Sequence, residues 1–400
     1  MNNKRIFIFA SEGLPSRYGI GKFIDILYHE SKKVERYDFF FVRRSEHFTQ
    51  MIISKSNNVT DIQIPYPINS QNKLSFIESL AILCLIDEKF KLTKDDTVHI
   101  NDNSHFGIIR NVKKYFGCKV IYTMHVLLWQ IFYNNDFNRF SIDWSNRKEI
   151  RDNLFLNVLK NEQQICEISD FVVVLNNETL SFVKKVYAIK NEKVQLTPNG
   201  LSMPAQIETS SQTNQLKEVL GIEDNYKIIL YVGRIDRQKG VGYLIQSTIT
   251  LIKQGHKLKL ILVGNGEIDN MIELIYGYWS DIIFTGYVDQ EKVYEFYSIS
   301  DIIVSPTYAE QSSFSILESI SFKKPLIVSN IPAFDFLIDN ISVLKVDPLT
   351  DRPKLTRQIS RLLEDDSLGK KLSDNAYNLY LKNYTSDRMF KRYLDLYAKI

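Results

Sequence analysis

Two cations and two carboxylates in the second half of the sequence are spaced as expected for a site that binds a charged, hydroxyl-bearing ligand. Arg234 and Lys239 lie in a glycine-containing loop that follows an apolar run, and Glu310 and Glu318 flank the segment QSSFSIL. Two cations at the end of a strand suit a pyrophosphate, and two glutamates could reach the two ends of a polyhydroxylated ligand. The alternative is that the loop is solvated and carries ordinary surface charges.

The positions of the two glutamates depend on where a helix begins. A helix that starts near Ser313 places Glu318 about one and a half turns inside it and leaves Glu310 on the preceding loop. Serine is a favourable residue at a helix N-terminus because its hydroxyl accepts a hydrogen bond from the first turn. Under the alternative interpretation, Glu310 is a capping acid and Glu318 is a helix acid that faces solvent.

A glycine-containing loop also follows the first apolar run of the chain. Gly19 and Gly21 belong to the segment EGLPSRYGIGK, directly before an amphipathic stretch. Glycines let backbone N–H groups approach an anion, which a helix N-terminus also favours. The third glycine of the dinucleotide fingerprint would fall at Ile24, so the loop does not have that motif. The alternative is a tight turn without a ligand.

Histidines follow two other apolar runs of the first half. His125 ends the segment VIYTMH, where a lone histidine is more often a packed or solvated loop residue than a catalyst. His99 and His105 lie with Asn101 and Asp102 in a polar cluster, but their spacing fits no helical histidine pair that binds a metal. The sequence has no DxD motif either. We therefore predict no metal site.

Ten short β-branched and aromatic runs must position these residues. Each is followed by a polar turn and an amphipathic stretch of helix length, which indicates parallel sheets built from βαβ units. Five runs in each half favour two doubly wound α/β domains over one wide sheet. The predicted strands are residues 6–9, 39–42, 98–100, 120–123 and 171–175 in the first half, and 228–232, 258–263, 282–284, 302–304 and 326–328 in the second.

A polar segment separates the two halves. Residues 198–200 (Pro-Asn-Gly) are a turn signal, and residues 204–215 have no apolar periodicity. We therefore place a hinge near residues 200–215, between an N-terminal domain of residues 1–200 and a C-terminal domain of residues 201–384. Near the end of the chain, residues 387–400 space apolar side chains as one helical face.

Length and composition limit the class of protein. The 400 residues correspond to two or three domains, and 44% hydrophobic with 24% charged residues is ordinary for a globular protein. A net charge of +3 gives no reason to expect a nucleic-acid partner. Three widely spaced cysteines suggest a reducing compartment. Because we find no apolar run of about 20 residues and no signal-peptide pattern, we expect a cytoplasmic protein.

The second-half motifs together resemble the retaining glycosyltransferases of family 4, also called glycosyltransferase group 1. The first half matches more loosely, through the glycine loop, His99 and the Thr123-Met124-His125 strand end. The landmarks of the second half are, in chain order, PNG at 198–200, GR at 233–234, KG at 239–240, VGNG at 263–266, FTGYV at 284–288, EQSSFSILE at 310–318 and KPLIV at 324–328.

The resemblance implies the GT-B fold, in which two Rossmann-like domains face each other across a cleft. The N-terminal domain would be on the acceptor side and the C-terminal domain would bind the nucleotide-sugar donor. A C-terminal helix at about residues 385–400 would cross back and complete the N-terminal domain. Its apolar face would consist of Met389, Phe390, Tyr393, Leu394 and Tyr397.

The resemblance also implies a role for each matched residue of the second half. Arg234 and Lys239 would bind the donor diphosphate and stabilise the charge that develops on it as the glycosidic bond breaks. Glu310 would hold the donor sugar and Glu318 the ribose hydroxyls. The backbone around Gly286, Tyr287 and Val288 would lie against the base. The donor-binding set would be completed by Gly233, Ser312, Ser313 and Phe314.

In the first half, the resemblance places the Gly19–Gly21 loop toward the phosphates and the acceptor, and His125 toward the sugar near the scissile bond.

The sequence departs from the family at three positions. The usual Glu-Gly-Phe-Gly becomes Glu-Gln-Ser-Ser at 310–313, Lys324 replaces a common glycine, and Val126 replaces a frequent acid after His125. We interpret these changes as a divergent subfamily with altered donor choice.

The implied function is transfer of a sugar, with retention, from a UDP- or GDP-sugar to a saccharide, lipid-linked or peptide hydroxyl. No metal and no other cofactor is expected. Two alternatives remain: a sugar-nucleotide epimerase of the same architecture, and a catalytically silent GT-B protein that binds or chaperones a partner. Scattered basic pairs in the first half are typical of solvated surface, so we expect at most weak, salt-sensitive peripheral contact with the inner face of a membrane.

Overall fold

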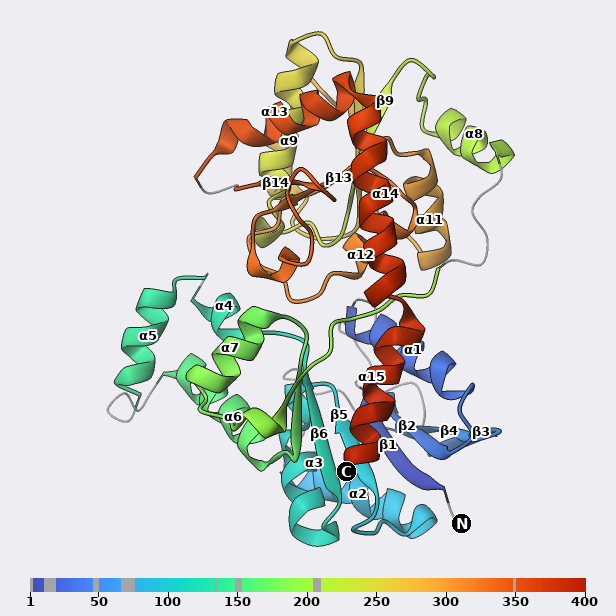
Figure 1. Ribbon diagram of the computed structural model, residues 1–400, viewed down its shortest axis with the longest axis vertical. Helices are drawn as coiled ribbons and strands as arrows, with labels where there is room; N and C mark the ends of the chain where they lie inside the picture. The colour runs from blue at the N-terminus through green and yellow to red at the C-terminus, as the bar shows by residue number, and fades with distance from the viewer. Residues whose placement is uncertain are drawn as a thin grey trace. The chain divides into compact units, whose positions relative to one another are not determined.

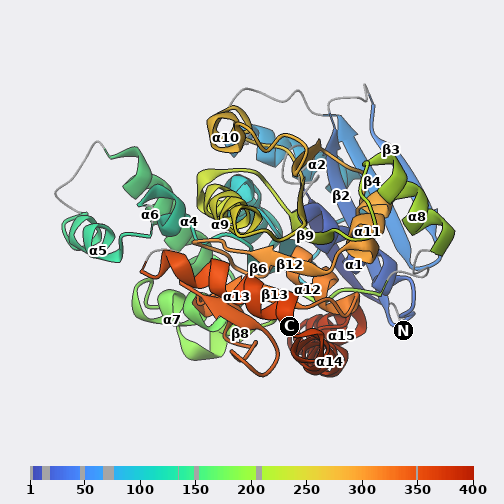
Figure 2. The ribbon, with the colours of Figure 1, turned by 90° about the horizontal axis from the view of Figure 1, so that it is seen from above.

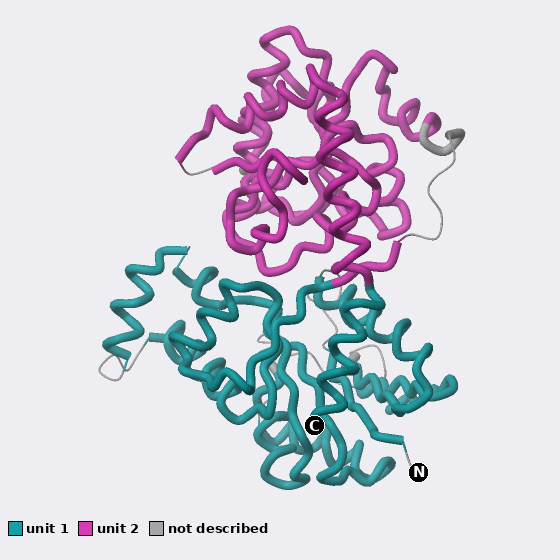
Figure 3. The backbone as a smooth tube through the Cα atoms, viewed as in Figure 1, with its two compact units in different colours: residues 1–199, 386–400 teal, residues 200–385 magenta. Residues whose placement is uncertain are grey.

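The computed structural model describes residues 3–10, 19–45, 50–65, 76–133, 135–147, 153–203, 210–347 and 350–400. The chain divides into two compact units, one formed by residues 1–199 and 386–400 and the other by residues 200–385 (Figure 3). The division falls within the Pro-Asn-Gly turn. Residues 204–209, part of the hinge expected from the sequence, lie outside the described residues.

The first unit is built on an eight-stranded sheet of order β3-β4-β2-β1-β5-β6-β7-β8. All neighbouring strands are parallel except the antiparallel pair β3 and β4, which departs from the predicted all-parallel pattern. The strands are β1 (Lys4–Ala10), β2 (Tyr37–Ser45), β3 (Ile52–Ser56), β4 (Val59–Pro65), β5 (Thr97–Ile100), β6 (Lys119–Met124), β7 (Phe171–Val174) and β8 (Val194–Leu196).

Helices cover both faces of this sheet. Because side chains alternate along a strand, Phe7 and Phe9 of β1 pack into one core, together with side chains of α2, α3, α6 and α7. On the other face, Phe39 of β2 packs against Phe390 of α15. The helices of this unit are α1 (Gly19–Ser31), α2 (Phe76–Phe90), α3 (Phe106–Asn111), α4 (Leu128–Phe132), α5 (Phe137–Ser145), α6 (Leu154–Ile168), α7 (Asn177–Lys185) and α15 (Ser386–Lys399).

The last helix of the chain, α15, belongs to the first unit and lies beside α1 (Figure 1). Four of the five side chains predicted for its apolar face, Met389, Phe390, Tyr393 and Tyr397, are buried. The fifth position is wrong: Leu394 is only half-buried, and Leu396 is buried in its place. The buried face of α15 is therefore rotated slightly about the helix axis from the face that the sequence pattern indicates.

The second unit contains a parallel six-stranded sheet of order β11-β10-β9-β12-β13-β14. The chain starts at the central strand β9, builds outward to β11, and then returns to the other side of β9. Such a reversal leaves a crevice at the carboxyl ends of the two central strands, where α/β proteins bind ligands. The strands are β9 (Lys227–Val232), β10 (Leu258–Val263), β11 (Ile282–Gly286), β12 (Ile302–Ser305), β13 (Leu326–Ser329) and β14 (Leu344–Val346).

Two helical layers cover the second sheet. Helices α9 and α13 pack together over one core, and α12 packs against α14 (Figures 1 and 2). No helix in the described parts of either unit is long and apolar enough to cross a membrane. The helices of this unit are α8 (Ser210–Val219), α9 (Val241–Lys253), α10 (Asp269–Ile272), α11 (Gln290–Ile299), α12 (Phe314–Ser321), α13 (Arg352–Glu364) and α14 (Asp366–Asn383).

Candidate active site

The loop after β9 carries both predicted cations at the carboxyl end of the central strand. The backbone of Gly233 packs so closely against Gly264, after β10, that a Cβ on Gly264 would lie 1.9 Å from the Gly233 carbonyl oxygen. The hydroxyl of Tyr231 donates a hydrogen bond of 2.6 Å to the carbonyl of Arg234. Backbone packing and this hydrogen bond therefore fix the start of the loop.

Asp236 organises the rest of this loop. Its side chain accepts a hydrogen bond of 3.0 Å from the amide of Lys239, and its other oxygen lies 3.3 Å from the Arg234 guanidinium. Gly240 then turns the chain into α9 with a φ of 68°, and a Cβ there would lie 2.1 Å from the Pro306 carbonyl oxygen. The loop after β9 thus packs directly against the loop after β12.

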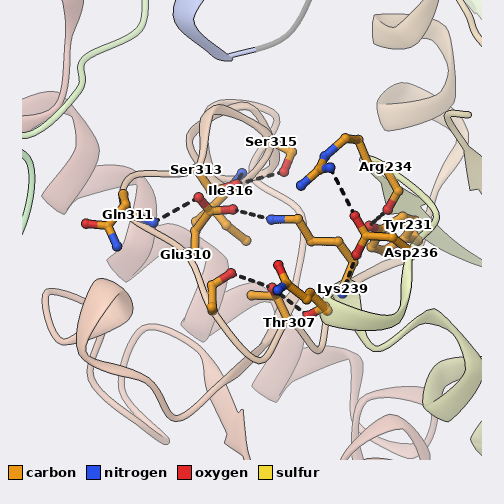
Figure 4. A network of polar contacts seen from close by, with 12 residues as sticks. Tyr231, Arg234, Asp236, Lys239, Thr307, Glu310, Gln311, Ser313, Ser315 and Ile316 are labelled. Atoms are coloured by element: carbon orange, nitrogen blue, oxygen red, sulfur yellow. Dashed lines mark hydrogen bonds and ion pairs between the residues drawn. The ribbon is translucent and has the colours of Figure 1, made fainter. Parts of the chain in front are cut away.

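The loop after β12 brings Glu310 to Lys239. The Lys239 ammonium lies 2.8 Å from Oε2 of Glu310, and the amide of Gln311 donates to Oε1 at 2.9 Å (Figure 4). Burial raises the pKa of Glu310, but Lys239, this amide and Arg234 outweigh it and hold the pKa below the usual value of 4.5. Arg234, Lys239 and Glu310 therefore form one electrostatic cluster.

The second glutamate lies on α12, as the sequence predicts. Ser313 is the N-cap of this helix, and its hydroxyl accepts a hydrogen bond of 3.4 Å from the amide of Ile316. Glu318 is buried in the helix, and its two carboxylate oxygens accept hydrogen bonds from Gln290 and Tyr297. Glu318 is therefore not a solvent-facing acid.

The remaining predicted donor residues of the second unit lie at the end of β11 and beside Glu310. Gly286 ends β11, and its carbonyl accepts a hydrogen bond of 3.0 Å from the amide of Gly264. Tyr287 is about half exposed and Val288 is partly buried. Beside Glu310, Ser312 is partly buried and Phe314 is buried at the start of α12.

Three predicted residues belong to the first unit. Gly19 and Gly21 are in the first turn of α1, and residues 11–18 of their loop lie outside the described residues. The ring of His125 packs edge-on against Phe23 of α1, and its Nε2 is buried without a hydrogen-bond partner. Burial lowers the pKa of His125 to about 4, so its ring is neutral near pH 7.

His99 has a structural partner that sequence reasoning missed. Its Nδ1 lies 2.8 Å from the hydroxyl of Tyr397 on α15, and its Nε2 lies 2.8 Å from the hydroxyl of Thr123. Burial, and to a smaller extent His125, lowers the pKa of His99 to about 3. No local pattern could reveal this contact, because the two residues are 298 positions apart.

Other members of the polar cluster after β5 do not gather as metal ligands. His105 is fully buried beside Phe9, and neither of its ring nitrogens has a hydrogen-bond partner. Asn101 donates a hydrogen bond of 3.3 Å to the carbonyl of Phe9. Within the described residues, no group of three or more His, Cys, Asp or Glu side chains could hold a metal ion.

Solved structures show the class of fold to which this arrangement belongs. Sucrose-phosphate synthase from Thermosynechococcus elongatus matches 99% of both chains with a TM-score of 0.81 and 19% sequence identity. HepE from Anabaena, solved in complex with UDP and glucose, matches 100% of both chains with a TM-score of 0.74 and 13% identity. The protein therefore has the GT-B fold of two Rossmann-like domains.

Sequence comparison finds similarity to a known family within the second unit. Residues 212–379, which lie in the second unit, match the model of the glycosyl transferases group 1. Alpha-D-kanosaminyltransferase from Streptomyces kanamyceticus is 26% identical over 196 residues, which are 48% of this chain and 50% of that protein. The chain matches several curated relatives along little more than half of their length.

Proposed function

We propose that the protein is a retaining glycosyltransferase that moves a sugar from a UDP- or GDP-sugar to a saccharide, lipid-linked or peptide hydroxyl. The observation that carries the proposal is the cluster of Arg234, Lys239 and Glu310 at the carboxyl ends of the central strands of the second sheet. Two cations beside the N-terminus of α9 suit a diphosphate, since cations and helix N-termini both stabilise negative charge. The HepE complex with UDP and glucose supports a nucleotide-sugar donor.

In the proposed reaction, the acceptor hydroxyl oxygen forms a bond to the anomeric carbon of the donor sugar. The bond between this carbon and the diphosphate breaks, and its electron pair leaves with the nucleoside diphosphate. A phosphate oxygen of the donor takes the proton of the acceptor hydroxyl, so attack and departure occur on the same face and the anomeric configuration is retained. Arg234 and Lys239 stabilise the charge on the leaving group, a role that would make a metal ion unnecessary.

Glu310 and Glu318 have separate roles in this proposal. Glu310, held by Lys239, binds hydroxyls of the donor sugar, and Glu318 binds the ribose. The Gln311-Ser312-Ser313 segment replaces the small residues common at this place, and we propose that it changes the choice of donor sugar. His125, neutral and partly buried in the first unit, is proposed to contact the sugar near the scissile bond.

An activity screen tests the proposal. The purified protein is incubated with UDP- and GDP-sugars and with mixed saccharide, lipid-linked and peptide acceptors, and released UDP or GDP is measured. Acceptor-dependent release with one donor, with an α-linked product from an α-linked donor by NMR, is the expected result. Epimerised donor without release would indicate the epimerase, and neither turnover nor nucleotide binding would indicate a silent binding protein.

A further inference from the structure

The carboxylate of Glu318 is held at both oxygens by one neighbouring helix. Nε2 of Gln290 donates a hydrogen bond of 2.8 Å to Oε1, and the hydroxyl of Tyr297 donates one of 2.8 Å to Oε2. Both donors belong to α11, whereas Glu318 is on α12. Only 4% of the surface of Glu318 is exposed, and these two contacts hold its carboxylate at both oxygens.

The two donors differ in how firmly they are held. Tyr297 is fully buried, and its ring stacks on Phe322 at a centroid distance of 5.3 Å. Burial raises the pKa of Tyr297 well above its usual value, so its hydroxyl remains a donor at all physiological pH values. Gln290 is exposed at the first position of α11, directly after the N-cap Asp289. The side chain of Tyr297 is therefore held in place by packing, whereas the side chain of Gln290 is free to change its rotamer.

Gln290 also connects Glu318 to a second part of the donor site. It follows Tyr287, Val288 and Asp289, the segment that leaves β11 and is proposed to lie against the base. An ionised carboxylate accepts about four hydrogen bonds, so protein donors and ribose hydroxyls can share it. The hydrogen bond from Gln290 therefore joins the base segment to the proposed ribose ligand.

We propose that Gln290 is a positioning residue that orients Glu318 for the ribose hydroxyls of the donor nucleotide. This inference rests on the proposed function, in which Glu318 binds the ribose. Hydrogen bonds to a charged group are strong and directional, so rotation of the carboxylate weakens its contact with the ribose. Loss of the Gln290 amide should then weaken binding of a ribonucleotide and leave binding of its 2′-deoxy analogue unchanged.

Calorimetric titration with UDP and 2′-deoxy-UDP tests the proposal, with GDP and 2′-deoxy-GDP as a parallel pair. Gln290→Met keeps the length and apolar stem of the side chain and removes its amide. Lys292→Met, at an exposed position of the same helical turn, is the matched control. We expect Gln290→Met to reduce the preference for ribose about tenfold, the scale of one hydrogen bond to a charged group, and Lys292→Met to leave it unchanged.

The outcomes separate the positioning role from the proposed function. If wild type prefers the ribonucleotide and Gln290→Met keeps that preference, the positioning role is wrong while the ribose role of Glu318 stands. Tighter ribonucleotide binding by Gln290→Met would also overturn it, because Gln290 would then compete with the ribose. If wild type binds neither nucleotide pair, or binds without preference for ribose, the proposed role of Glu318 fails as well.

Tyr297→Phe gives a second measurement on the same carboxylate. This variant keeps the stacked ring and removes the hydroxyl that donates to Oε2 of Glu318. We expect the ribose preference to fall here too, with thermal unfolding monitored separately because the position is buried. A preference that is unchanged in both Tyr297→Phe and Gln290→Met would show that α11 does not orient Glu318.

Discussion

The ammonium of Lys239 lies 2.8 Å from Oε2 of Glu310, and this contact joins the loop after β9 to the loop after β12. Both side chains are mostly buried, with 18% and 22% of their surfaces exposed. The positive charge proposed to meet the donor diphosphate is therefore already balanced by a carboxylate. A diphosphate that binds beside Lys239 has to share its ammonium with Glu310.

Because Glu310 and a bound diphosphate would share the ammonium of Lys239, we predict that Glu310→Gln changes the affinity for UDP. The amide is close in shape to the carboxylate but carries no charge, so it competes less strongly for Lys239 and does not repel the diphosphate. We expect UDP to bind about fivefold more tightly, which corresponds to about 1 kcal/mol, while turnover falls because the proposed sugar contact is weakened. Calorimetry and a release assay check this, and weaker UDP binding would contradict it.

Buried neutral histidines predict a loss of stability in acid. The pKa values of His99, His105 and His125 are lowered from 6.5 to about 3, 4 and 4, mainly by burial. Below pH 6.5 the unfolded chain takes up protons that the folded protein does not, so stability falls as the pH decreases. Each histidine contributes up to about 1.4 kcal/mol per pH unit.

The variant His105→Leu tests the contribution of one of these histidines to the loss of stability in acid. Because neither ring nitrogen of His105 has a hydrogen-bond partner, the substitution removes no hydrogen bond at neutral pH. Burial and the charge of Arg44 lower the pKa of His105, and Asp102 opposes them. Urea unfolding should give a shallower loss of stability between about pH 6 and pH 4.5 for the variant. An identical slope would show that His105 titrates normally.

For Glu162, we predict that the stability of the protein depends on pH with the opposite sign. It is buried in the first unit, where Tyr187 donates a hydrogen bond of 2.8 Å to Oε2. Burial raises its pKa from 4.5 to about 8, and the hydrogen bond from Tyr187 only partly offsets this. Glu162 makes its full contribution to the free energy of unfolding below pH 4.5. This contribution is lost as the pH rises toward 8, because Glu162 ionises at a lower pH in the unfolded chain than in the folded protein.

Glu162→Gln should remove this loss, since an amide still accepts from Tyr187 and cannot ionise. At pH 8 we expect the variant to be more stable than wild type by a few kcal/mol, on the scale of about 1.4 kcal/mol per pH unit. Glu167→Gln, at an exposed position of the same helix, is the matched control. Equal stability of Glu162→Gln and wild type at pH 8 would show that Glu162 is ionised at little cost.

The packing of α15 predicts that the first unit depends on the end of the chain. Five large side chains of α15 are buried, and burial of such a side chain stabilises by about 1.5–3 kcal/mol. Ending the chain at Thr385 should therefore destabilise the first unit by several kcal/mol. The second unit keeps the bond from the amide of Leu201 to the carbonyl of Tyr384 and should still bind nucleotide.

A milder substitution tests the polar contact beneath α15. Tyr397→Phe leaves Nδ1 of the buried His99 without its hydroxyl partner, which should cost about 1–3 kcal/mol in the free energy of unfolding. Phe390→Leu, a change on the same face, provides the comparison for packing alone. No loss of stability in Tyr397→Phe would mean that the histidine finds another partner.

Local patterns predicted the elements whose side chains are buried on both sides or capped. Each of the ten apolar runs is a strand, and Ser313 caps α12 because its hydroxyl acts within one helical turn. Four strands of the described chain were missed: β8 and β14 have three residues each, every residue of β3 is exposed, and β4 is a seven-residue strand with mostly buried side chains that pairs with β3. An exposed edge strand is held mainly by its backbone, so its side chains carry little signal.

Pairings between distant residues could not be predicted in the same way. The sequence indicated Glu318 but not its partners Gln290 and Tyr297, because exposed glutamines and buried tyrosines are common. It placed His99 in a polar cluster, whereas the hydroxyl that meets it comes from the end of the chain. Such pairs depend on how strands and helices stack, which local residue spacing does not encode.

The central claim is that Arg234 and Lys239 bind the donor diphosphate, and paired titration with UDP and uridine tests it most directly. GDP and guanosine serve as the second pair, and Arg237→Ala, an exposed cation of the same loop, is the control. In wild type, we expect the nucleoside diphosphate to bind much more tightly than the nucleoside. In Lys239→Ala this preference should fall about 10- to 100-fold, and Arg237→Ala should keep it. A preference that is the same in Lys239→Ala, Arg234→Ala and wild type would contradict the claim.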